Sequence, residues 1–381
     1  MRNKITLALF ALTVLILAGC AKDEAPAGEE LQIQNPEIPA DIQASLDKAM
    51  AELEADYNNP PASEEVGSRA TVYVPAGSVD ALQEAIEDAG WGGKVVLRSG
   101  DHWESETVMI KHTVRIIGEN GAKVYLNTLP ADATDGDGQI LTEPGIHVKN
   151  ANLVRIENIE FLPAGPSGSM ALFLEGGRIA RIQGNKFTNF KYPVWLSDLS
   201  NATGIYDNEF YGGGGITAWG ITLESGKSVK VKGNYFQDCV VGLFLSDERA
   251  IASDNVAVNG SIGILLCTVQ GTIVMPDGEV LQKAISCTQA RVIKNNCHDN
   301  YWNYLVIDGA NHNFLFRNEA ANAGLYDVEL AGPTERFGTP SPTSSNNFVV
   351  NRNNSIITKD CGVNNTVLAG TMVNNEEDPC F

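Results

Sequence analysis

Positive charge is scarce in this sequence. The 381 residues carry 27 Lys and Arg against 47 Asp and Glu, so the formal net charge is −20 at pH 7. Binding to a phosphate backbone needs clustered Lys or Arg side chains that release counterions. The sequence therefore excludes a nucleic-acid-binding role, and its overall charge disfavours general attraction to anionic membrane surfaces.

Charged residues of both signs are also few. They make up 19% of the chain, below the roughly 25% of ordinary globular domains. The chain is instead rich in turn residues, with 37 Gly and 33 Asn, and 17 of the Asn lie between Asn295 and Asn375. Gly and Asn tolerate left-handed backbone and tight turns. This composition favours an all-β protein.

Long hydrophobic runs are absent apart from one near the N-terminus. Arg2 and Lys4 precede an apolar run from Ile5 to Leu17, which is too short to span a bilayer and is typical of a secretory signal peptide. The run ends in Leu-Ala-Gly-Cys at 17–20, which resembles the lipobox of bacterial lipoproteins. The resemblance implies that Cys20 is lipidated and becomes the first mature residue. The alternative is an ordinary signal peptide that contains a cysteine.

The residues after Cys20 bear on the compartment. Ala-Lys-Asp-Glu at 21–24 resembles the signal that sends lipoproteins to the cell surface in one Gram-negative phylum. We therefore expect an outer membrane lipoprotein, on the cell surface or the periplasmic face, with the lipid as its membrane contact. Residues 21–69 are predicted to be an acidic tether with one amphipathic helix from Asp41 to Tyr57, because Ile42, Leu46, Met50 and Leu53 follow helical spacing.

Six cysteines follow Cys20, an even number that predicts disulfides in an oxidising compartment. They are Cys239, Cys267, Cys287, Cys297, Cys361 and Cys380. Cys267 and Cys287 bracket a predicted hairpin of 272–275 and 279–285, and Cys361 and Cys380 would close the C-terminal tail. The connectivity stays open.

An internal repeat organises most of the chain. The pattern apolar-x-apolar-x-x-Asn, usually followed by Phe, recurs at intervals of 21 to 27 residues with one longer interval that contains the predicted hairpin. Its asparagines are Asn158, Asn185, Asn208, Asn234, Asn255, Asn295 and Asn318. Each repeat also supplies a second short apolar segment, so stacked coils that form parallel sheets fit best. In such coils the Asn would form an internal amide ladder at a left-handed corner, with the Phe stacked beside it.

This repeat resembles the right-handed parallel β-helix proteins of the pectate-lyase-like superfamily. The segment before the first coils supports the resemblance, because a short helix with Ala81, Leu82, Ala85 and Ile86 precedes the strands at 94–97 and 114–118, as in the N-terminal cap of that superfamily. The resemblance implies a β-helix over 70–356 and a C-terminal tail over 357–381. It identifies the architecture and leaves the activity open, because the fold hosts lyases, hydrolases, epimerases and binding proteins.

Strand alternation predicts which side chains leave the coil. The middle residues of the second segment would form an outward column of His147, Phe173, Trp195, Thr222, Phe244, Leu265, Val306 and Glu329. A second column would contain Lys149, Glu175, Ser197, Glu224, Ser246, Cys267 and Asp308. Sugar rings stack on aromatic side chains, so His147, Phe173, Trp195, Phe244 and Asp308 are candidate substrate-binding residues. The resembled enzymes carry their substrate groove on the same sheet.

For acid–base chemistry the candidates are Glu175, Glu224 and Lys149. The two glutamates would sit two coils, about 9.6 Å, apart, near the carboxyl spacing of inverting glycosidases. For a lyase, Lys149 or His147 would be the base, and a calcium ion on Glu175 or Glu224 would neutralise the uronate. The competing interpretation is an ordinary surface ion pair between Lys149 and Glu175. The ordered motifs of polygalacturonases and pectate lyases are missing.

Two further interpretations stay open. The outward column could be buried beneath the hairpin, residues 331–346 or the N-terminal helix. The segment from His298 to Tyr304, with Asp308 and His312, mixes titratable and stacking groups and is a second candidate cluster. The chain contains only five His, which disfavours a dedicated copper site.

We thus expect a cell-envelope lipoprotein whose β-helix binds, and in one interpretation cleaves, an extracellular polysaccharide. The alternative is a non-catalytic structural or adhesion module.

Overall fold

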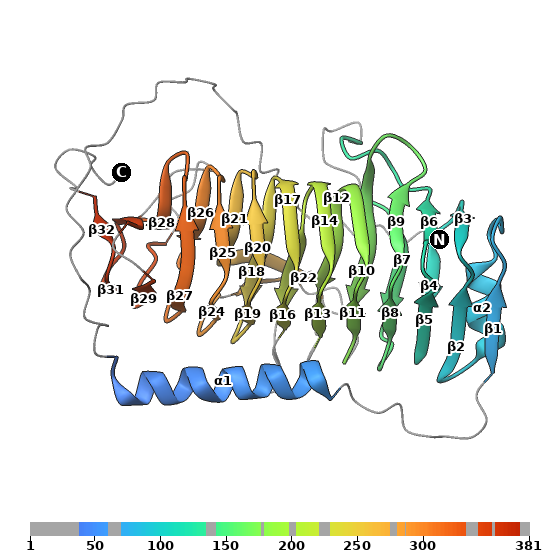
Figure 1. Ribbon diagram of the computed structural model, residues 1–381, viewed down its shortest axis with the longest axis horizontal. Helices are drawn as coiled ribbons and strands as arrows, with labels where there is room; N and C mark the ends of the chain where they lie inside the picture. The colour runs from blue at the N-terminus through green and yellow to red at the C-terminus, as the bar shows by residue number, and fades with distance from the viewer. Residues whose placement is uncertain are drawn as a thin grey trace.

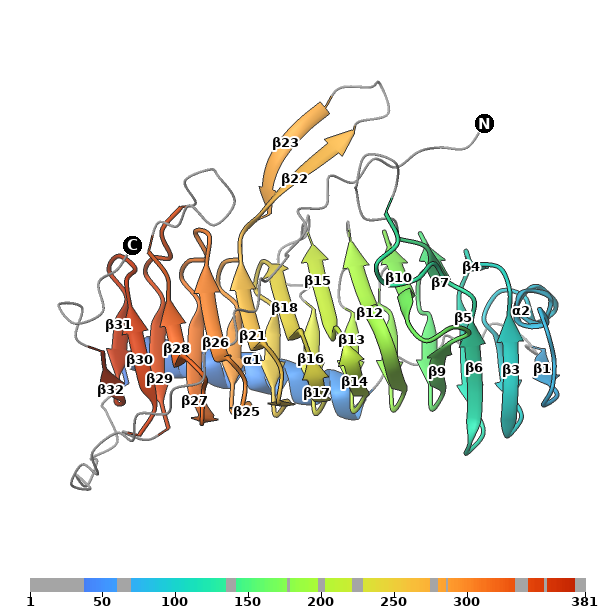
Figure 2. The same cartoon turned by 90° about the horizontal axis from the view of Figure 1, so that it is seen from above.

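The computed structural model describes residues 38–59, 70–134, 142–176, 179–197, 203–220, 229–274, 280–285, 287–332, 342–352 and 355–373. Thirty strands join in one continuous parallel sheet that winds into a solenoid, as Figures 1 and 2 show. The predicted all-β parallel β-helix is therefore confirmed. The ladder runs on past residue 356 to Met372, because β30 to β32 pair in parallel with the preceding coils.

The solenoid has three faces, each a ladder of strands from successive coils. Face A contains β1 (Thr71–Val74), β2 (Gly93–Leu97), β5 (Val114–Gly118), β8 (Arg155–Glu157), β11 (Arg181–Gln183), β13 (Gly204–Tyr206), β16 (Lys230–Lys232), β19 (Ile251–Ser253), β24 (Arg291–Ile293), β27 (Phe314–Ala321), β29 (Phe348–Asn351) and β31 (Thr366–Leu368). Face B contains β3 (Gly100–Glu104), β6 (Ala122–Leu126), β9 (Glu160–Pro163), the start of β12 (Lys186–Ser197), β14 (Glu209–Gly213), β17 (Tyr235–Cys239), β20 (Val256–Val258), β25 (Asn296–His298) and the end of β27. Face C contains β4 (Val108–Ile110), β7 (Pro144–Lys149), β10 (Gly168–Glu175), the end of β12, β15 (Ile216–Gly220), β18 (Val241–Asp247), β21 (Ile262–Cys267), β26 (Trp302–Ile307), β28 (Tyr326–Leu330), β30 (Ile357–Asp360) and β32 (Thr371–Met372).

The interior is held by the predicted amide ladder. Each side-chain amide bonds the next one along the coils, through Asn185, Asn208, Asn234, Asn255, Asn295 and Asn318. Each side-chain oxygen also accepts from the backbone N–H of the preceding ladder residue, at 2.9–3.0 Å. Asn158 is not a member, because Ile159 occupies its ladder position and donates its N–H to Asn185.

The left-handed corner lies one residue before each ladder Asn. Asn158, Asp207, Asp254 and Lys294 have φ between 53° and 59°, and Gly184 and Gly233 take the same position at 66° and 71°. The predicted ring stack lies beside the ladder and contains Phe161, Phe187, Phe210 and Phe236, with centroids 4.9–5.1 Å apart. A second amide ladder joins Asn313, Asn347 and Asn365 near the C-terminal end.

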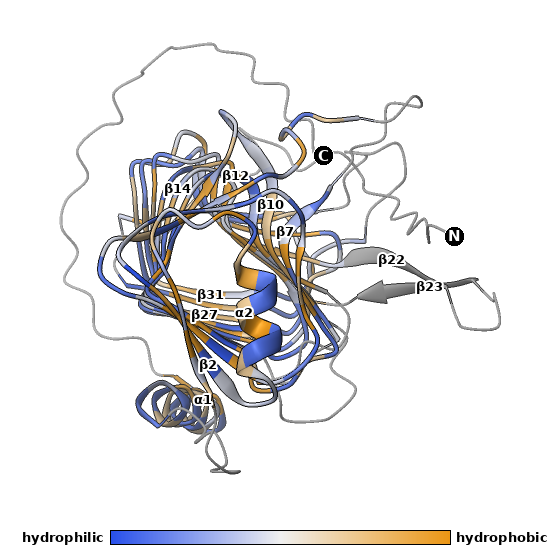
Figure 3. Ribbon diagram, turned by 90° about the vertical axis from the view of Figure 1, so that its right-hand side faces the viewer, coloured by the Kyte–Doolittle hydropathy of each residue, from blue (hydrophilic) through white to orange (hydrophobic). Residues whose placement is uncertain are grey.

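Two helices flank the solenoid. Helix α2 (Leu82–Ala89) covers the N-terminal opening, as Figure 3 shows, and the carboxylate of Glu104 accepts the N–H of Leu82 at its first turn. Helix α1 (Ala40–Asn58), predicted as an amphipathic helix at 41–57, lies along face A from β31 to β11 (Figure 1). Leu46, Ala49 and Leu53 are buried against that face.

The disulfide prediction is wrong for four cysteines. Cys239, Cys267, Cys287 and Cys297 are free thiols and are buried; the small Cys side chain packs here as an apolar residue. Cys361 is disulfide-bonded, and its predicted partner Cys380 lies outside the described residues. The predicted hairpin is confirmed, because β22 (Val269–Val274) pairs antiparallel with β23 (Val280–Ile285) and projects from the coils in Figure 2.

Asn295→Ala tests the amide ladder. It removes the side-chain oxygen that accepts from the backbone N–H and the side-chain amide of Asn255, and the amide that donates to Asn318 Oδ1, at a cost of about 3 kcal/mol. We expect a clear drop in melting temperature. Asn296→Ala is the matched control, because this neighbouring residue is part-exposed. Equal effects of the two changes would contradict a stabilising ladder.

Glu104→Gln tests, through the pH dependence of stability, whether the carboxyl group beneath helix α2 titrates with a raised pKa. Burial raises the pKa of Glu104 to about 7, against the lowering effect of its bond from Leu82. A raised carboxyl pKa means that the folded state holds the proton more tightly, so stability falls as pH rises from the ordinary Glu value to about 7. The variant should lose this part of the pH dependence in urea melts at pH 4.5 to 7. An unchanged slope would show that the carboxyl does not titrate there.

Candidate functional site

The outward column of face C follows the predicted alternation with two corrections. By register it contains Met109, His147, Phe173, Trp195, Thr217, Phe244, Leu265, Leu305, Glu329 and Lys359. Thr217 stands where Thr222 was predicted, because the strand begins directly after the glycines at 212–215. Thr222 lies outside the described residues.

Leu305 replaces Val306, which points into the core and is fully buried. Tyr304 and Val306 are the inward pair of this strand, which the sequence pattern missed because Tyr304 carries a hydroxyl. That hydroxyl bonds the backbone oxygens of Asn295 and Glu319 at 3.0 and 2.9 Å. Because its hydroxyl is hydrogen-bonded, the Tyr304 side chain can be buried in the interior of the solenoid.

Much of this column is covered. Trp195 is 3% exposed and lies 4.7 Å, ring to ring, from Tyr192. Leu265, Leu305 and Cys267 are buried in an outer apolar cluster with Ala331, against which Phe244 packs. For Trp195 and for the coils around Leu265 and Leu305, the structure therefore supports the alternative in which the outward column is buried. Helix α1 lies on face A and does not contribute to this cover.

Asp308 also belongs to this covered region. Its carboxylate accepts a hydrogen bond from the Cys267 thiol, with Sγ and Oδ2 3.3 Å apart. Burial, followed by the charge of Asp308, raises the pKa of Cys267 well above its ordinary value. The predicted substrate-binding role of Asp308 has no support from this contact.

The part of face C that brings the predicted residues together is the pair of coils β7 and β10. His147 Nε2 lies 2.8 Å from Glu175 Oε2, and Lys149 Nζ lies 3.2 Å from the same oxygen. Phe173 packs on the His147 ring at 4.8 Å, tilted by 31°. We call His147, Lys149, Phe173 and Glu175 the His147 cluster.

The cluster is part-exposed, so a ligand can reach it. The exposed fractions are 13% for the His147 side chain, 24% for Glu175 and 39% for Lys149. The hydrogen bond from His147, supported by Lys149, holds the pKa of Glu175 below its ordinary value against the effect of burial. Glu175 is thus a carboxylate at neutral pH, and the predicted Lys149–Glu175 ion pair is present. The bond between His147 and Glu175, which the sequence pattern did not predict, is a diagonal contact between neighbouring strands.

The predicted pair of Glu175 and Glu224 is not tested by the described residues. Glu224 lies outside them, and the register position two coils beyond Glu175 belongs to Trp219, through the pairing of 175 with 197 and of 196 with 218. Over the described part of the chain, no group of three or more His, Cys, Asp or Glu side chains is arranged to hold a metal.

The second predicted cluster, from His298 to His312, does not converge. His298 Nδ1 bonds the Asp299 carboxylate at 2.7 Å, and His312 Nδ1 bonds the Asn311 side chain at 2.8 Å. Asp299 and His312 have positive φ, as residues in turns do. These contacts support turn chemistry at both histidines.

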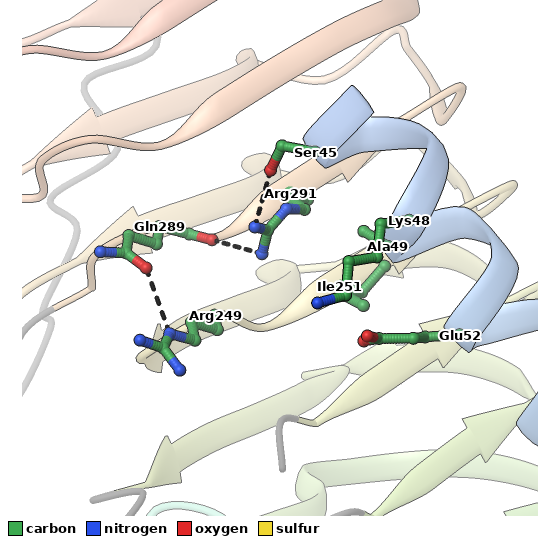
Figure 4. A pocket seen from close by; sticks show the side chains of 8 residues that line it. All are labelled: Ser45, Lys48, Ala49, Glu52, Arg249, Ile251, Gln289 and Arg291. Carbon is green, nitrogen blue, oxygen red and sulfur yellow. Dashed lines mark hydrogen bonds between the residues drawn. The ribbon is translucent and has the colours of Figure 1, made fainter. Parts of the chain in front are cut away.

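A pocket of about 280 Å³ lies on the opposite side, between α1 and face A. Its polar lining comes from Ser45, Lys48, Glu52, Arg249, Gln289 and Arg291, as Figure 4 shows. Gln289 accepts from Arg249 Nε, and Arg291 donates to Ser45 Oγ at 3.0 Å. The bond from Arg291 to Ser45 joins helix α1 to face A.

Comparisons with known proteins agree with the architecture. Residues 144–280 match the family model for the right handed beta helix region. Together with the parallel ladder on both sides of that segment, the match shows that the chain has a right-handed parallel β-helix fold. No curated protein matches the chain in sequence. None of the described helices is long and apolar enough to cross a membrane.

Solved structures resemble the chain at low identity. An exopolygalacturonase from Thermotoga maritima has a TM-score of 0.48 at 13% identity, covering 86% of this chain and 94% of its own. The surface protein and adhesin PfbA of Streptococcus pneumoniae has 0.44 at 13%, covering 81% and 98%. An alginate lyase of family PL6, bound to a trisaccharide, has 0.43 at 11%, covering 84% and 90%.

Glu175→Gln tests the charge state of the cluster. A lowered carboxyl pKa contributes stability that is present above the ordinary Glu value and lost as pH falls through the folded value. Wild type should therefore be more stable than the variant at neutral pH, and the difference should shrink on acidification. A difference that is constant with pH in urea melts would contradict a paired carboxylate.

Proposed function

We propose that this protein is a cell-envelope lipoprotein whose β-helix binds an extracellular polysaccharide at the His147 cluster. The observation that carries the proposal is the meeting of a part-exposed aromatic ring, Phe173, with an imidazole, a carboxylate and an ammonium on two adjacent coils. The family match supports the architecture only, so the proposal rests on these side chains.

The cluster offers each type of contact that a sugar needs. An aromatic ring packs against the C–H face of a pyranose. Glu175 accepts hydrogen bonds from hydroxyls, and Lys149, which is 39% exposed, pairs with an acid group on the sugar. Because Lys149 and Glu175 lie on neighbouring strands of a rigid ladder, both side chains are held in position before a ligand arrives.

The more specific part of the proposal is that the protein cleaves the polysaccharide that it binds. If His147 donates Nε2–H to Glu175, its Nδ1 keeps a lone pair that can accept a proton, as in other carboxylate-oriented imidazoles. In an elimination, His147 would take the proton from the carbon beside a uronate carboxylate. The electron pair of that C–H bond would form a C=C bond, the glycosidic C–O bond would break, and the leaving oxygen would take a proton from water. Lys149 would neutralise the carboxylate, with calcium as a further candidate for that role.

The anchor is proposed from the sequence. Cys20 would carry the lipid, and residues 21–37 would connect it to α1, which is docked on face A by Leu46, Ala49 and Leu53. The protein would then sit at the outer membrane, on the surface or the periplasmic side.

A non-catalytic adhesion or binding role is the second candidate. The burial of Trp195, Leu265 and Leu305 favours it, because a covered column leaves a short binding surface rather than a long groove. The two candidates differ in turnover and share the same binding surface.

The experiment incubates residues 21–381 with neutral and uronic polysaccharides, with and without calcium, and measures both binding and product masses. Phe173→Ala should weaken binding about tenfold, the loss of roughly 1.4 kcal/mol, with little change in melting temperature. Phe244→Ala is the control, because Phe244 packs on the outer apolar cluster, so it should lower the melting temperature and leave binding intact.

The product masses separate the two candidates. An unsaturated chain end that is lost in Glu175→Gln or His147→Gln, with binding retained, would support a lyase; an added water would indicate a hydrolase. Intact polymers with retained binding would support adhesion. If Phe173→Ala and wild type bind equally, the His147 cluster is not the site.

A further inference from the structure

We infer that the pocket between helix α1 and face A binds a small sugar acid, and that the bound acid stabilises the docked position of α1. The pocket has a volume of about 280 Å³, near the lower end of the usual range of roughly 300–1,000 Å³ for small-molecule sites, so a ligand of about one ring fits. Both elements supply polar groups, as Figure 4 shows: Ser45, Lys48 and Glu52 from α1, and Arg249, Gln289 and Arg291 from the coils. We call it the α1 pocket.

The charges around the α1 pocket differ from those along the rest of the helix. Helix α1 contains five acidic residues and one base, Lys48. Toward the end of the helix, acid meets base, because Asp56 pairs with Lys230 and Glu54 pairs with Lys232. At the α1 pocket, the one base of the helix instead lines the same space as two arginines of the coils. Gathering like charges in this way costs free energy, which an anion between them would offset.

Two of these cations have bonding capacity left for a ligand. Arg249 donates from Nε to Gln289 Oε1 at 3.1 Å, and the same nitrogen lies 3.7 Å from Glu248 Oε1. Its terminal nitrogens have no hydrogen-bond partner within the described ranges, and its side chain is 37% exposed. Lys48 is exposed, and its ammonium likewise has no partner among the residues that the structure describes. Both groups can therefore reach a ligand.

The third cation, Arg291, is part-buried with little negative charge around it. Its terminal nitrogens donate to Ser45 Oγ at 3.0 Å and to the Gln289 carbonyl oxygen at 3.3 Å. Its Nε is buried and has no hydrogen-bond partner in the described part of the chain. Burial lowers the pKa of Arg291, the charge of Glu52 raises it, and the neighbouring Arg249 lowers it again. An anion in the α1 pocket would supply the missing negative charge.

The remaining lining indicates a hydroxylated acid rather than a bare anion. The acid group would bind the terminal nitrogens of Arg249 and the Lys48 ammonium through charge-assisted hydrogen bonds. The Glu52 carboxylate repels an anion but accepts hydrogen bonds from hydroxyls. Ala49 and Ile251 are buried and line the same pocket, so they offer apolar contact to the C–H groups of a sugar ring. The α1 pocket differs from the His147 cluster in face and in chemistry.

The position of the pocket couples the ligand to the helix. Because α1 and the coils each form one side of it, the complete site exists only while α1 is docked. A ligand that binds only the docked form stabilises that form by mass action. At a ligand concentration of 100 times Kd, the undocked population should fall about a hundredfold.

The test follows hydrogen exchange of the α1 amides in residues 21–381, with glucuronate as the acid and glucose as the neutral probe. Exchange that proceeds through undocking of α1 should slow about a hundredfold at 100 times Kd of glucuronate. Glucose should leave it unchanged. In Lys48→Gln, the glucuronate Kd obtained from the same exchange rates should rise at least tenfold, because one charge-assisted bond is lost.

The matched control is Lys294→Gln, which removes the same charge from an exposed residue directly after β24. It should keep the wild-type Kd, and equal weakening by both variants would reduce the effect to net charge and overturn the site. Unchanged α1 exchange at saturating glucuronate, or equal slowing by glucose, would also overturn it. If inorganic phosphate slows the exchange as strongly as glucuronate does, the assignment to a sugar acid is wrong. Phe173→Ala, which tests the His147 cluster, should leave the α1 response intact.

Discussion

The amide ladder is the constraint on which the rest of the structure depends. From Asn185 to Asn295, each ladder Asn accepts a backbone N–H of the previous coil and donates to the Asn side chain of the next, and Asn318 ends the ladder. Because these groups are buried, a shift of one residue would leave several of them unsatisfied. The ladder therefore fixes the register of each coil, while the loops between strands differ in length, including the 40 residues between Asn255 and Asn295.

Because the register is fixed, residues at the same position of successive coils lie side by side and form rows on each face. The side chains of these rows determine what each face can bind. On face C, the row brings His147 beside Phe173 and within bonding distance of Glu175. On face B the signs of the charges alternate along the outer row, and Glu160 pairs with both Lys123 and Lys186. On face A, Lys230 and Lys232 pair with acidic side chains of helix α1. The proposed binding site at the His147 cluster thus arises from the repeat, through one position within it.

The sequence predicted the features that recur in each repeat and missed those that arise from contacts particular to one coil. The coils, the ladder from Asn185 onwards, the Phe stack, α1 and the hairpin follow from periodicity and spacing. Trp195 and Leu265 could not be placed as buried, because their cover comes from non-repeating contacts such as Tyr192 and Ala331. The strand at Thr217 was misplaced because a glycine run hides its start. The free thiols were missed because compartment and parity, rather than distance, suggested disulfides.

The central claim is that the His147 cluster contacts a sugar, and a crystal structure with a bound oligosaccharide tests it most directly. The ligand should be the one that binds most tightly among the neutral and uronic sugars tested. The account predicts a sugar ring over Phe173, with an acid or hydroxyl group within hydrogen-bond distance of Lys149 and Glu175. A sugar held elsewhere on the solenoid, with the His147–Glu175 contact unliganded, would contradict it.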